Sequence, residues 1–65
     1  NFQPPVTGEE IMETFGIPPS KPIGTIKNAI KEAILEGDIP NEIAAARKLM
    51  HRIAADMGLV TVKAA

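Results

Sequence analysis

The prolines between residues 18 and 22 constrain this chain more than any other sequence feature. Pro18, Pro19 and Pro22 each lack a backbone N–H and restrict the residue before them. The segment therefore cannot lie inside a helix, and it predicts a rigid connector between two helices. Glycines that can end helices follow each of three apolar, helix-like segments, at positions 16, 37 and 58. The expected fold is all-α, a small three-helix domain.

The start of the first helix is marked by Thr7. Its hydroxyl can accept a hydrogen bond from the Glu10 amide, while the Glu10 carboxylate can reach back to the start of the helix. Val6 and Ile11 would form a hydrophobic staple across this start. The helix is about two turns long, and Gly16 is expected to end it in a left-handed conformation.

Two longer helices are predicted from apolar residues that recur at three- and four-residue steps. The second begins near Pro22, with Ser20 or Lys21 as its cap, and stops at Gly37; its apolar face holds Ile23, Ile26, Ile30, Ala33 and Ile34. The third runs from Glu42 to about Met57 after an Asn41 cap, with an apolar face of Ile43, Ala46, Leu49, Met50, Ile53 and Met57. A short loop should make these helices antiparallel, and the proline-rich turn before them resembles a helix-hairpin-helix connection.

The absence of cysteine and the presence of one histidine exclude a disulfide framework and a zinc site. A reducing, cytoplasmic compartment is the expectation. No apolar run approaches the roughly 18 residues that span a bilayer. Residues 1–6 have the composition of a linker from a preceding domain, so the chain is expected to be part of a longer protein. Residues 7–58 would form the helical domain and residues 59–65 a C-terminal extension.

Catalytic machinery is not predicted in this chain. A nucleophile such as Ser20 would need His51 beside it, oriented by Asp38 or Asp56. These residues fall at caps and on exposed helix faces, with no strand-turn-helix elbow and no phosphate-binding glycine loop. The glutamates of the first helix are accounted for by the capping box and the helix dipole.

A basic face on the second helix is the strongest candidate site. Gly24, Lys27, Asn28 and Lys31 share this face, and Lys21 lies near the exposed helix N-terminus. Free N–H groups, lysines and a glycine that admits another backbone suit contact with RNA phosphates. The alternative is that Gly24 only permits close packing with the first helix and that the lysines are only solvated. Leu35 falls on the same face without an explanation.

A weaker basic patch is predicted on the third helix, where Arg47, Lys48 and Arg52 lie opposite the apolar face. The chain has no Trp and no Tyr, and its only aromatic residues are Phe2 and Phe15. Base stacking is therefore not expected. Any contact with nucleic acid should depend on backbone and shape.

Several of these elements together resemble the C-terminal tail of bacterial tRNA nucleotidyltransferases, the CCA-adding enzymes and the related poly(A) polymerases. The resemblance covers residues 6 to about 42 and rests on segments 7–12, 16–19, 23–24 and 34–41. Two positions depart from the family pattern: Ser20, where the family usually has glycine, and Pro22, where it often has an acidic residue.

The resemblance implies a role and no activity for the chain itself. In such enzymes paired aspartates in an N-terminal head domain transfer the nucleotide, with Mg²⁺ as cofactor and CTP and ATP as substrates, and many members carry an HD phosphohydrolase-like domain. The tail would hold the tRNA while its 3′ end is extended. The residues do not separate CCA addition from poly(A) addition, and a helical protein-interaction module remains the alternative of a different class.

Overall fold

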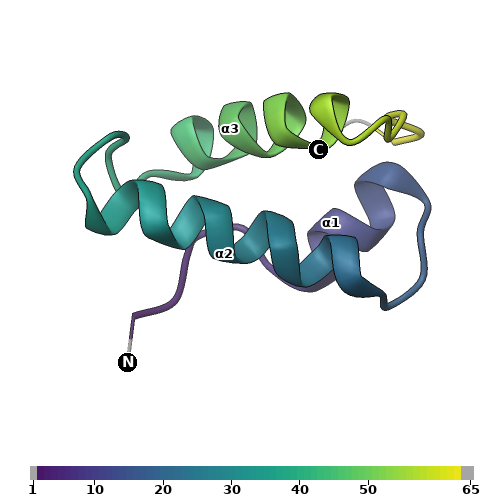
Figure 1. Cartoon of the computed structure of the whole chain (residues 1–65), viewed down its shortest axis with the longest axis horizontal. Helices are drawn as coiled ribbons and strands as arrows, with labels where there is room; N and C mark the ends of the chain where they lie inside the picture. The colour runs from purple at the N-terminus through teal and green to yellow at the C-terminus, as the bar shows by residue number, and fades with distance from the viewer. Residues whose placement is uncertain (1, 64–65) are drawn as a thin grey trace.

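The computed structural model describes residues 2–63, which form three α-helices and no strand (Figure 1). Helix α1 spans Gly8–Phe15, α2 spans Lys21–Leu35 and α3 spans Ile43–Asp56. The all-α, three-helix prediction is confirmed. Helix α3 is capped one residue later than expected, at Glu42, and Met57 is its C-cap. None of these helices is long and apolar enough to cross a membrane.

The predicted capping box of α1 is half correct. The Glu10 amide donates to Thr7 Oγ1 at 3.1 Å, as expected for an N-cap. The Glu10 carboxylate, however, binds Arg47 of α3, because a charged guanidinium gives a stronger hydrogen bond than a backbone amide. Ser20 is the N-cap residue of α2 and has an extended backbone, but its side chain makes no capping hydrogen bond. Its hydroxyl donates instead to the Pro18 carbonyl at 2.7 Å.

All three helices are followed by a glycine with positive φ, as the sequence predicts. Gly16 has φ 62°, and its amide and that of Ile17 both donate to the Met12 carbonyl. A Cβ at this position would lie 3.0 Å from Val62 Cγ2. Gly16 therefore serves both the left-handed turn and the close approach of the C-terminal segment.

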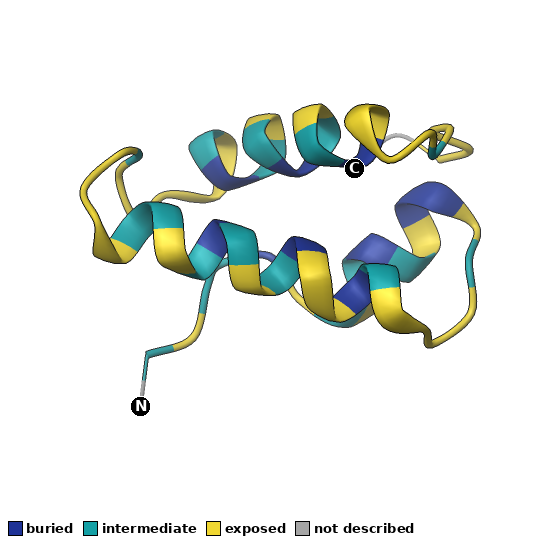
Figure 2. Ribbon diagram, viewed as in Figure 1, coloured by how far each residue is buried: buried dark blue, intermediate teal, exposed yellow. Residues whose placement is uncertain are grey.

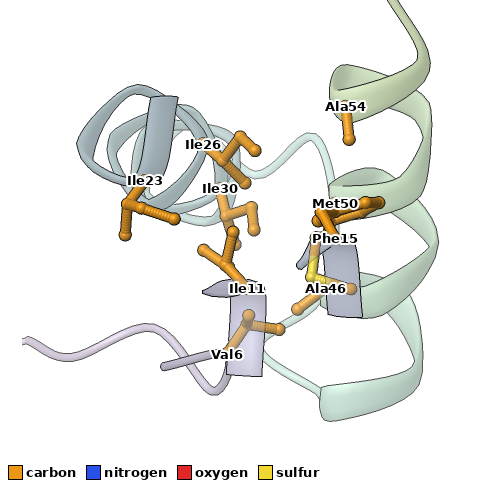
Figure 3. Packing of buried hydrophobic residues seen from close by; sticks show 9 residues of the cluster. All are labelled: Val6, Ile11, Phe15, Ile23, Ile26, Ile30, Ala46, Met50 and Ala54. Carbon is orange, nitrogen blue, oxygen red and sulfur yellow. The ribbon is translucent and has the colours of Figure 1, made fainter. Parts of the chain in front are cut away.

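Helices α2 and α3 run in opposite directions along the molecule, joined by a short loop (Figure 1). Figure 3 looks nearly along α2 and shows α3 passing across it at an incline. The two helices therefore run in opposite directions, but their axes cross at an angle and are not parallel to each other. Helix α1 packs on α2, where the Cβ of an alanine at Gly8 would lie 3.4 Å from Ile23.

One apolar cluster joins the three helices, and Figure 3 shows its side chains converging between them. Figure 2 shows that the buried positions of each helix lie on its inner side. The cluster also includes Val6, which is fully buried although it belongs to the stretch predicted as a linker. The buried apolar residues are Val6, Ile11, Phe15, Ile23, Ile26, Ile30, Ala46, Met50 and Ala54.

The C-terminal segment folds back onto α1. The amides of Val62 and Lys63 both donate to the Thr14 carbonyl, at 2.8 and 3.2 Å, and Leu59 packs against the core. Residues 59–63 are thus fastened to the domain. Of the predicted terminal segments, residues 1, 64 and 65 lie outside the described part of the chain.

Candidate nucleic-acid interface

A groove on the outer face of α2 brings together four of the five residues predicted to contact RNA. Gly24, Lys27, Asn28 and Lys31 form one wall of it. The other wall is the extended arm at the N-terminus, which contributes Phe2, Gln3 and Pro4. The groove has a volume of about 310 Å³. Lys21, the fifth predicted residue, is exposed in the first turn of α2 and does not line the groove.

Helical spacing explains this wall. Positions 24, 27, 28 and 31 are separated by three or four residues and therefore share one side of α2. On the other side Ile23, Ile26 and Ile30 are buried in the core, which fixes the rotation of the helix about its axis. The candidate face is consequently held outward, with Gly24 and Asn28 exposed and both lysines half-buried.

Packing against α1 does not require a glycine at position 24. Apart from its chain neighbours and its own helix backbone, a Cβ at Gly24 would meet no atom of residues 2–63 within 4 Å, so the alternative that this glycine permits close packing with α1 is wrong. Gly8 has that role, from the α1 side of the contact. Gly24 instead leaves the backbone of α2 open to the groove.

Uncompensated positive charge lies along this wall. Within residues 2–63, neither Lys27 nor Lys31 has a carboxylate oxygen within the 4.0 Å of an ion pair. Lys27 and Lys31 are four positions apart on α2, so their backbone positions lie about one helical turn apart on the same face. The wall therefore offers two cations to an anionic ligand.

The structure separates the three residues of the predicted second patch. Arg47 turns toward α1, where its Nε lies 2.7 Å from Glu10 Oε2 and its Nη2 lies 3.4 Å from Oε1. The hydrogen bond to Glu10 raises the pKa of Arg47 above its ordinary value, against the loss of solvation and with help from charge attraction. Lys48 and Arg52 lie on another side of α3 and line a second groove, of about 320 Å³, with Ile39, Ala45 and Leu49.

The surface around Arg47 is acidic. A third groove, of about 350 Å³, is lined by Thr7, Glu9, Glu10, Glu13, Thr14, Arg47 and Lys63. Lys63 Nζ lies 3.8 Å from Glu13 in this region. Because Arg47 is paired with Glu10 in a groove that two further carboxylates line, it is poorly placed to meet a phosphate. Residues 2–63 hold no group of three or more His, Cys, Asp or Glu side chains that could bind a metal ion.

His51 is half-buried between α1 and the C-terminal segment. Its ring meets the edge of Phe15, with centroids 5.6 Å apart, and its Nδ1 lies 3.3 Å from Thr61 Oγ1. Ser20 hydrogen-bonds the Pro18 carbonyl and is not a partner of this ring. The observed contacts of His51 fasten the C-terminal segment to the helices.

The N-terminal arm is the part of the site that the sequence did not reveal. Its residues look like a linker by composition, yet Phe2, Gln3 and Pro4 line the groove. The staple residue Val6 was the available signal, because a buried residue there holds the residues before it near α2.

A comparison with protein-family models, curated proteins and solved structures finds no match to this chain.

Proposed function

We propose that this chain is an RNA-binding domain that contacts the sugar-phosphate backbone through the groove along α2. The observation that carries the proposal is the convergence of Gly24, Lys27, Asn28 and Lys31 on one open wall, where neither lysine has an ion-pair partner among residues 2–63. The resemblance to the tail of CCA-adding tRNA nucleotidyltransferases supports RNA as the polyanion.

The chemistry of the wall suits a phosphate. Two ammonium groups one turn apart can contact successive phosphate oxygens, and release of condensed counterions then favours binding. The Asn28 amide can donate to phosphate or ribose oxygens. The open backbone at Gly24 allows a sugar to approach more closely than any side chain would permit.

The proposed context is the C-terminal tail of a nucleotidyltransferase in the cytoplasm. Nucleotide transfer, with Mg²⁺ and with CTP and ATP as substrates, belongs in this proposal to a head domain elsewhere in the parent enzyme. The tail would hold the tRNA body during CCA addition. The same groove suits a poly(A) polymerase, since backbone contacts do not distinguish the RNA substrates.

The proposal is tested by charge reversal on two faces. The K27E/K31E variant removes both cations of the groove, whereas the control K48E/R52E makes the same change in net charge on α3. We expect K27E/K31E to weaken tRNA binding by about tenfold or more in an anisotropy titration at moderate salt, and K48E/R52E to weaken it less. Equal losses would show that net charge alone governs binding, and no loss in either would reject the RNA site.

A helical protein-interaction module is the second candidate, and the second groove favours it. Lys48 and Arg52 lie there beside Ile39 and Leu49, which suits a partner segment that carries both acidic and apolar side chains. The two functions differ in one observable. An interaction module would bind neither tRNA nor duplex RNA in a salt-dependent manner.

A further inference from the structure

We infer that the groove along α2 receives an unpaired ribonucleotide, with its base against the ring of Phe2 and its phosphate at Lys27 and Lys31. The inference rests on the proposed function and names the form of RNA that this site takes. It also revises the expectation that contact would depend only on backbone and shape. That expectation followed from the small number of aromatic residues, and the structure places one of the two beside the lysines.

The arm holds Phe2 in place although it has no secondary structure. Val6 anchors the arm because its side chain is fully buried in the core. Between Val6 and Phe2, Pro4 and Pro5 restrict the backbone to extended conformations. Phe2 itself is half-buried and lines the groove, so it lies within reach of a ligand bound there.

The volume of the groove suits one unpaired nucleotide. Its volume of about 310 Å³ is at the low end of the roughly 300–1,000 Å³ typical of small-molecule sites, and a duplex does not fit within it. Bases of a duplex are covered on both faces by their neighbours, so they can stack on Phe2 only after they leave the helix. An unpaired base offers its face without that cost.

Charge and stacking are adjacent in this groove, as in proteins that bind single strands. Such proteins combine cations that follow the backbone with aromatic rings on which bases stack, and the stacking tolerates any base. Here Lys27 and Lys31 of α2 would supply the cations and Phe2 of the arm the ring, since all three residues line the groove. Asn28, between the lysines in sequence, is exposed beside them and can donate to the ribose 2′-hydroxyl that marks RNA.

The absence of tryptophan from the chain provides a direct test. The F2W variant keeps an aromatic face and adds the only indole, whose fluorescence a stacked base would quench. The F2L variant keeps apolar bulk and loses the aromatic face. Each variant is titrated with a single-stranded RNA of about six nucleotides and with an RNA duplex that carries the same number of phosphates.

We expect single-stranded RNA to quench the F2W indole strongly and the duplex to quench it little. F2L should bind the single strand about tenfold more weakly than the wild type and the duplex equally well. Circular dichroism of each variant checks that the three helices are retained. F2W should restore the affinity that F2L loses, which a merely structural role of the ring would not require.

The outcomes separate the two proposals. If F2L binds the single strand as tightly as the wild type and F2W is not quenched, while K27Q/K31Q still weakens binding, Phe2 does not stack and only the present inference is overturned. If K27Q/K31Q also binds both RNAs like the wild type, the RNA-binding function itself is wrong.

Discussion

Gly24 is a residue whose identity costs stability without serving the fold. Glycine in a helix is less favourable than alanine, because its backbone loses more freedom on folding. Nothing in the structure requires it, since a Cβ at Gly24 would meet no atom within 4 Å. The groove supplies the missing reason if a ligand approaches the backbone there.

The G24A variant should therefore be more stable and bind RNA more weakly. We expect the free energy of unfolding to rise by about 0.5–1 kcal/mol, measured by urea denaturation. RNA affinity, measured in parallel by anisotropy, should fall because the new methyl group narrows the groove. A more stable variant with unchanged affinity would show that the open backbone at this position has no role in binding.

Gly37 provides the matched control for this substitution. A Cβ at Gly37 would also have no contact within 4 Å outside its chain neighbours, among residues 2–63, but φ at this position is 80°, a conformation that alanine disfavours. G37A should lower the free energy of unfolding by about 1 kcal/mol or more. Opposite signs for G24A and G37A would show that backbone conformation decides the stability effects.

The fully buried isoleucines of α2 carry a large share of the stability. Ile26 and Ile30 both have zero exposure, and truncation of such a residue to alanine typically costs about 2–5 kcal/mol. A core of this size supplies only about 3–5 kcal/mol in total. I26A should therefore be largely unfolded at room temperature by circular dichroism, whereas L35A, at a position 58% exposed, should unfold like the wild type.

At the scale of the helices, the two N-caps that precede α1 and α2 differ in a way that can be measured. Thr7 accepts a hydrogen bond from the Glu10 amide, whereas Ser20 makes no side-chain cap to α2. T7A should lower the free energy of unfolding by about 1 kcal/mol, and S20A by clearly less. Chemical denaturation of both variants checks this order, and a larger cost for S20A would refute the capping account.

Local sequence signals predicted the elements well because their causes lie within a few residues. The N-cap at Thr7 and the helix ends at Gly16, Gly37 and Gly58 all depend on neighbours in sequence. The bond from Arg47 to Glu10 joins residues 37 positions apart, and no local pattern announces it. The capping box was therefore predicted to include the Glu10 carboxylate, which in the structure accepts a hydrogen bond from Arg47 of α3.

In the candidate site, too, features set by neighbours in sequence were predicted, and features set by distant contacts were not. Spacing along α2 predicted which residues share its outer face, and the structure brings four of them together. On α3, Lys48 and Arg52 are four positions apart and line one groove, whereas Arg47 pairs with Glu10 of α1, a contact 37 positions away that spacing along one helix does not reveal. The staple at Val6 indicated that the arm is anchored, but which face of α2 Phe2 reaches depends on packing between helices, so the arm wall was not predicted.

At the scale of the whole molecule, the chain has a formal net charge of −1 and nevertheless separates its charges in space. Arg47 and Lys63 pair with the α1 carboxylates Glu10 and Glu13, whereas the lysines of the α2 groove have no ion-pair partner in the described residues. A polyanion should therefore bind one face and be repelled by another. The proposed RNA binding rests on this separation of charge and not on the net charge.

The salt dependence of RNA binding tests this account most directly. The logarithm of the binding constant should fall linearly with the logarithm of salt concentration, and K27Q/K31Q should reduce the slope by about 1.4 for single-stranded RNA, or about 0.7 for each lost phosphate contact. K48Q/R52Q should leave the slope nearly unchanged. Equal slopes for the wild type and K27Q/K31Q would contradict the claim that these lysines contact phosphate.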